Sequence, residues 1–139
     1  MIKYDKEVIK IMKIAEKEAK DLSHQYVSTE HIILAVLKEN NSLSNIFKHH
    51  NIEYLDYKNL IIENIPKDEN FIFSYTPLLK SIISSAITKN RLTLKTFVTK
   101  ILEEENSLAY TFLKLIGCDI KKLYSSIINN NNIVYGINL

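Results

Sequence analysis

The chain has 139 residues, a formal net charge of +2 at neutral pH, one cysteine, two glycines and two prolines. This length suits one domain with its own core, and the scarcity of glycine and proline argues against a turn-rich all-β protein. One cysteine excludes an internal disulfide, and the near-neutral charge disfavours the basic surface that nucleic-acid binding requires.

The first half of the chain has the pattern of four helices. Val8, Met12, Ala15 and Ala19 fall at steps of three and four, so they form one apolar face of the first helix. A short loop and a second apolar helix follow, and then two more helices. The residues expected to begin the four helices are Asp5, Ser28 or Thr29, Ser42 and Glu53, and Asn51 is expected to end the third in a left-handed conformation.

A linker, residues 65–75, separates the two halves. Its aromatic residues Phe71, Phe73 and Tyr75 follow no helical period, so they either pack onto the bundle or form an apolar docking patch. The second half again has the pattern of four helices, with a polar tail after them that we expect to fray. Their expected first residues are Thr76 followed by Pro77, Thr93, Ser107 and Asp119, with Gly117 as the stop before the last helix.

The two halves resemble each other in sequence. When the second half is aligned below the first, several positions are identical: Glu39/Glu104, Asn41/Asn106, Ser42/Ser107 and Leu43/Leu108. The same alignment continues to the last helix of each half after a single insertion, which pairs Asn51 with Gly117. This order predicts two copies of one four-helix repeat, residues 5–64 and 76–130 approximately, related by a pseudo-twofold axis. We therefore expect an all-α, eight-helix bundle, with Ile33 and Ile83 in its core.

The segment Tyr26–Glu39, YVSTEHIILAVLKE, resembles the N-terminal domain of ClpA-, ClpB- and ClpC-type unfoldases, the ClpC type most closely. This resemblance implies a single Clp-N domain over residues 1–139 that docks adaptor proteins or protein substrates and does no chemistry. The glycines, Gly117 and Gly136, cannot form the phosphate loop of an ATPase. The second repeat diverges, because Leu94-Lys95-Thr96 stands where the first has Thr29-Glu30-His31.

The candidate binding residues are Val27, Ser28, Thr29 and Glu30, at the start of the second helix. A helix N-terminus attracts an anion, and a neighbouring glutamate binds a guanidinium, so the pair suits phosphoarginine. The resemblance to ClpC-type domains implies the same ligand. The alternative is an ordinary N-cap with a favourable first-turn acid. Lys95 would repel a guanidinium in the second repeat; it either binds a bare anion there or is a solvated surface residue.

Other reactive side chains give no clear site. His24 and His31 lack a third ligand nearby in sequence, and no motif surrounds Cys118, so we expect no metal, no cofactor and no catalytic residue. The alternatives to protein docking are a helical nucleic-acid-binding protein, another interaction protein unrelated to proteolysis, or a small enzyme. We expect a cytoplasmic monomer whose partners are proteins of a Clp system, with no nucleic acid and no membrane bound.

Overall fold

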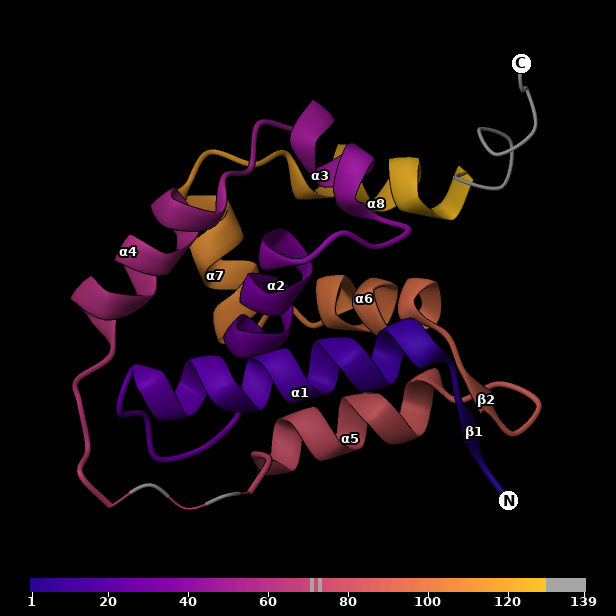
Figure 1. Ribbon diagram of the computed structural model, residues 1–139. Helices are drawn as coiled ribbons and strands as arrows, with labels where there is room; N and C mark the ends of the chain where they lie inside the picture. Colours follow the sequence, from indigo (N-terminus) through magenta and orange to yellow (C-terminus); the bar gives the residue numbers. More distant parts are fainter. Residues whose placement is uncertain (71, 73, 130–139) are drawn as a thin grey trace.

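The structure is a computed structural model that describes residues 1–70, 72 and 74–129 (Figure 1). Within these residues the chain forms eight helices and two strands of two residues each. In chain order these are β1 (Lys3–Tyr4), α1 (Lys6–Asp21), α2 (Thr29–Lys38), α3 (Ser44–His49), α4 (Tyr54–Asn64), α5 (Pro77–Ala86), β2 (Arg91–Leu92), α6 (Leu94–Glu103), α7 (Leu108–Leu115) and α8 (Ile120–Ile128). The prediction of an all-α, eight-helix bundle is confirmed.

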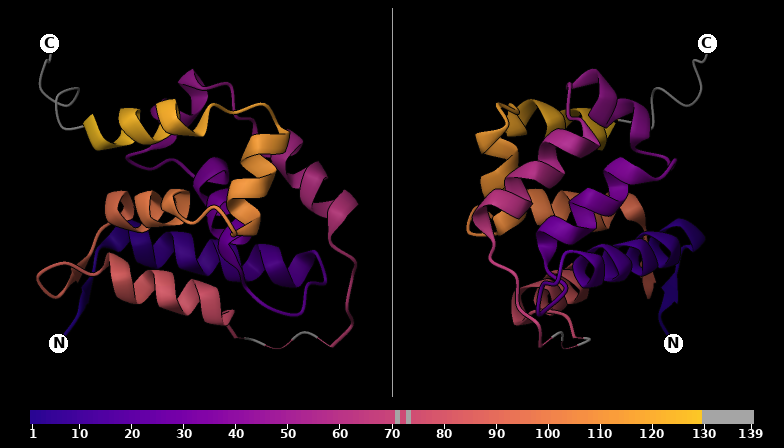
Figure 2. Two further views of the ribbon diagram at one scale, coloured as in Figure 1. Left: turned by 180° about the vertical axis from the view of Figure 1, so that it is seen from behind. Right: turned by 60° about the vertical axis from the view of Figure 1, so that its left-hand side comes forward.

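The helices enclose α2, whose residues from Thr29 to Val36 are all buried. Helices α1 and α5 lie at one end of the molecule and α3 and α8 at the other (Figures 1 and 2). Helix α2 lies between these ends and packs against α1, α4 and α7. The N-terminus of α2, which carries the candidate binding residues, is therefore inside the bundle.

Most helices begin where the sequence predicts. Ser28, rather than Thr29, is the N-cap of α2, and Thr93, at the matching position of the second repeat, is the N-cap of α6. Asn51 and Gly117 both adopt a positive φ, 59° and 91°, which lets the chain turn sharply after α3 and α7. These matching ends give the two repeats the same framework.

The predicted start of α3 is wrong. Ser42 does not cap this helix, because its hydroxyl donates to the carboxylate of Glu7 on α1 at 2.8 Å. Helix α3 begins at Ser44 instead, and the Ser44 hydroxyl accepts a hydrogen bond from the Asn41 N–H at 2.9 Å. The identical residue Ser107 does cap α7. A contact from another helix thus changes the role of one of two matching serines.

Two short strand pairings connect the repeats. Tyr4, before α1, pairs with Leu92, before α6; Tyr75, before α5, pairs with Val27, before α2. Leu92 is the counterpart of Val27 in the aligned repeats. In both pairings, the residue that precedes the first helix of one repeat therefore pairs with the residue that precedes the second helix of the other repeat. A pseudo-twofold axis produces this reciprocal pairing.

The last residue of the linker, Tyr75, takes part in the second of these pairings. Tyr75 is partly buried, and its hydroxyl donates to the Glu16 carboxylate on α1, so this residue packs onto the bundle. Phe71, Phe73 and the tail from residue 130 lie outside the described residues. None of the described helices has the length and apolar character needed to cross a membrane.

The core residues differ in how deeply they are buried. Ile33 is fully buried in α2, whereas Ile83 on α5 is only partly buried at the edge of the core. Ile83 therefore packs against the core but is not enclosed by it, because α5 lies at one end of the bundle (Figure 1).

We predict that Ile33→Ala lowers the free energy of unfolding by about 2–5 kcal/mol, the cost of a cavity in a closed core. Ile83→Ala should cost roughly 1 kcal/mol, since its surroundings can relax and part of the side chain is already hydrated. Urea denaturation of the two variants and the parent measures both values. Equal losses in the two variants would contradict this description of the core.

Candidate functional site

The N-terminus of α2 is closed by a reciprocal cap between Ser28 and His31. The Ser28 backbone N–H donates to the His31 Nδ1 at 2.9 Å, which satisfies a donor at the buried start of the helix. His31 is 1% exposed, so its ring is an internal part of the cap.

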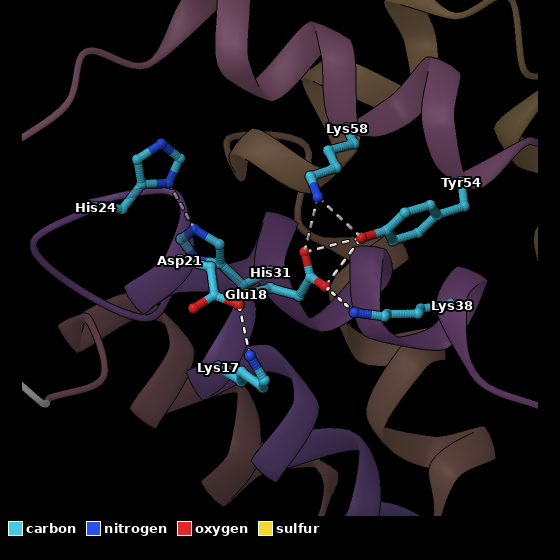
Figure 3. Close-up of polar contacts among 8 residues, drawn as sticks. All are labelled: Lys17, Glu18, Asp21, His24, His31, Lys38, Tyr54 and Lys58. Atoms are coloured by element: carbon cyan, nitrogen blue, oxygen red, sulfur yellow. Dashed lines mark hydrogen bonds and ion pairs between the residues drawn. The ribbon is translucent and has the colours of Figure 1, made fainter.

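His31 also contacts His24, in the loop after α1. The His24 Nδ1 and the His31 Nε2 are 2.8 Å apart, and the side chains point toward each other (Figure 3). Burial lowers the pKa of both rings, that of His31 to about 3, with a smaller contribution from the charge of His24. Both histidines are therefore neutral at physiological pH.

Val27 and Thr29, like Ser28, have structural contacts. Val27 is fully buried, and its backbone bonds to Ser74 and Thr76 of the segment before α5. Thr29 is also fully buried, and its Oγ1 accepts a hydrogen bond from the Ala109 N–H at 3.2 Å. Thr29 thus satisfies a backbone donor in the first turn of α7.

Glu30 lines a cavity of about 310 Å³ at the start of α2, together with Ser28, His24 and His31. Glu30 is only 2% exposed, and its Oε1 has no hydrogen-bond partner among the described residues. Burial raises the pKa of this carboxyl group, although hydrogen bonds from its own backbone and the Ser28 side chain oppose the shift. A buried acceptor without a partner is uncommon in a folded protein and requires an explanation.

The matching place in the second repeat is occupied. Lys95, the counterpart of Glu30, is partly buried, and its Nζ donates to the Ile128 backbone carbonyl at 3.0 Å. This bond satisfies a carbonyl at the C-terminus of α8, where a cation is favourable. Lys95 is therefore partly exposed, and one of its ammonium donors bonds to the C-terminus of α8.

A second buried carboxylate, Glu18, was not identified from the sequence. Glu18 on α1 is 2% exposed and accepts hydrogen bonds from the Lys38 Nζ at 2.7 Å and the Tyr54 hydroxyl at 2.9 Å (Figure 3). The Lys58 Nζ is 3.8 Å away. The cluster joins α1, α2 and α4. The sequence could have indicated this cluster in one way, because Glu18 lies on the apolar face of α1.

The remaining candidates show little reactive character. Burial and the neighbouring Asp119 raise the pKa of the Cys118 thiol to about 11, so the nucleophilic thiolate is scarce at neutral pH. Over the described ranges, no three His, Cys, Asp or Glu side chains gather in an arrangement that could hold a metal ion.

The buried carboxylate of Glu30 should affect the stability of the fold in a way that depends on pH. Because folding raises the pKa of Glu30, its ionisation costs folding free energy as the pH rises from 4.5 through the folded pKa. We predict that Glu30→Gln is more stable than the parent at pH 7, by about 1 kcal/mol. This gain should disappear below pH 4.5.

Urea denaturation at pH 7 and pH 4 measures this difference. The exposed Glu105→Gln provides the matched control and should change the stability little at either pH. A Glu30→Gln variant that is less stable than the parent at pH 7 would show that the carboxylate has a structural partner.

Comparisons with known proteins agree with this fold. Residues 2–50 match the model of the Clp repeat (R) N-terminal domain. The chain is 27% identical over 136 residues to an ATP-dependent Clp protease ATP-binding subunit ClpA homolog of Cyanidium caldarium; this covers 91% of the chain but only 16% of that relative.

A solved structure is also similar, the N-terminal domain of the caseinolytic protease associated chaperone ClpD from Arabidopsis thaliana. The TM-score is 0.76 at 13% sequence identity, covering 94% of this chain and 96% of that one. At this identity the likeness shows the fold alone. Residues 2–50 therefore contain a Clp repeat, and the chain has the fold of a Clp N-terminal domain.

Proposed function

We propose that this chain is a non-catalytic module that docks adaptor proteins or protein substrates for a Clp-type unfoldase, and that its first repeat binds arginine or phosphoarginine side chains. The similarity to Clp N-terminal domains supports the general role. The proposal includes a cytoplasmic, monomeric chain of the ClpC type whose partners are proteins.

The observation that carries the proposed ligand is the unpartnered Oε1 of Glu30 in a cavity. A guanidinium has donors for such a carboxylate and keeps its charge at every physiological pH. On binding, it would stabilise the ionised form of Glu30, whose charge is unfavourable in the free protein. The cavity therefore suits a cation better than an anion alone.

A phosphate on the guanidinium would have partners at the same cavity. Ser28 lines the cavity with a hydroxyl at the N-terminus of α2, where the helix dipole favours negative charge. Lys67 of the linker lines it as well. Glu30 for the guanidinium and Ser28 with Lys67 for the phosphate would form a bipartite site.

The second repeat lacks this combination. Lys95 replaces the glutamate and bonds to the end of α8, so the position offers no carboxylate to a guanidinium. We therefore propose one site per chain, in the first repeat.

Titration calorimetry with a phosphoarginine peptide tests this proposal. We predict a stoichiometry near one and a loss of roughly tenfold or more in affinity for Glu30→Gln, since a hydrogen bond to a charged group is typically worth about 1.5–3 kcal/mol. The matched variant Lys95→Met should bind like the parent, because it alters only the second repeat.

A phosphoserine peptide of the same sequence is the ligand control and should bind much more weakly. A stoichiometry near two, equal affinity in Glu30→Gln, or equal binding of the phosphoserine peptide would each contradict the proposed site.

A further inference from the structure

The hydrogen bonds around His31 have a fixed direction. The Ser28 N–H can only donate, so the His31 Nδ1 must be an unprotonated acceptor. The single proton of the neutral ring is then on Nε2, from which it donates to the His24 Nδ1 at 2.8 Å. The His24 Nδ1 is therefore also unprotonated, and each ring carries one proton.

A second proton on either ring would disrupt the hydrogen bonds that connect Ser28, His31 and His24. A proton on the His24 Nδ1 would face the His31 N–H at 2.8 Å, and a proton on the His31 Nδ1 would face the Ser28 N–H. Either one breaks a hydrogen bond. His24 and His31 are 4% and 1% exposed, so little solvent reaches either ring to replace the lost bond.

The loop that contains His24 also holds the linker. The Asp68 N–H donates to the Ser23 carbonyl at 2.6 Å, and the Ile72 N–H donates to the Gln25 carbonyl at 2.8 Å. A displacement of His24 would be transmitted to both bonds, because Ser23 and Gln25 flank it in the chain. Two backbone hydrogen bonds thus connect the described part of the linker to the residues on either side of His24.

Three charged groups line the same cavity as the two rings: Glu30 from α2, and Lys67 and Asp68 from the linker. The Glu30 Oε2 lies 4.0 Å from the His31 Nδ1. Thr76, the N-cap of α5, and Leu108, the first residue of α7, also line the cavity and carry no charge. Glu30 and Asp68 are the carboxylates of this cavity that could compensate the charge of a cationic His24.

We propose that the His24–His31 pair is a protonation latch: the neutral pair fixes residues 22–28 to α2 and the linker, and protonation of His24 at acid pH releases them and turns a cationic ring toward the cavity. That this release also regulates ligand binding rests on the proposed function. The latch itself does not, because it is a property of the free chain.

Nitrogen-15 NMR of the imidazole rings in the free chain tests the latch. At pH 7.5 we expect both rings to be neutral, with His31 protonated on Nε2. On acidification His24 should titrate below its ordinary value of 6.5, and the amide signals of Ser28, Asp68 and Ile72 should shift with the same midpoint.

Two variants complete the experiment. His24→Asn places an amide oxygen near the position of Nδ1, so it keeps the acceptor but cannot titrate; the shared transition of the three amides should disappear. His49→Asn removes an exposed histidine on α3 and should leave the transition unchanged.

The latch is overturned if the His31 proton is on Nδ1, if His24 titrates at 6.5 or above, or if the amides of the linker do not follow His24. These signals come from the free parent chain, so they decide the question even if His24→Asn fails to fold. Failure of peptide binding with an intact transition would count against the proposed function alone.

Discussion

The burial of the N-terminus of α2 is the constraint on which the rest of the structure depends. A helix start exposes backbone N–H groups, and inside a bundle they must find partners in the protein. His31 accepts from Ser28, and Thr29 accepts from Ala109 of α7, so this one turn connects two repeats. Glu30 remains with an oxygen that lacks a partner among the described residues.

The same framework carries different polar groups in the two repeats. The buried Glu18 accepts a hydrogen bond from Lys38 in the first repeat, while its counterpart in the second repeat is the apolar Ile83. Glu30 faces a cavity, while its counterpart Lys95 bonds to the end of α8. Shared caps and exchanged strand pairings preserve the fold. The polar substitutions give a ligand site to the first repeat in our proposal.

Local signals in the sequence predicted most of the fold. Caps such as Ser28 and Thr93, and the left-handed residue Asn51, depend on neighbours in the chain, so the sequence identifies them well. Ser42 was misassigned because its partner, Glu7, is on another helix. The contact of His24 with His31 likewise depends on how a loop packs. Residue type alone could nominate Glu30, but only packing reveals its burial.

The most direct test of this account is the pKa of Glu30, measured by carbon-13 NMR of its labelled carboxyl group with and without an arginine peptide. The account predicts a value above 4.5 in the free chain, because the carboxyl is buried without a partner for Oε1. The value should fall when the peptide binds, because a guanidinium stabilises the carboxylate. An ordinary pKa that the peptide does not change would contradict the account.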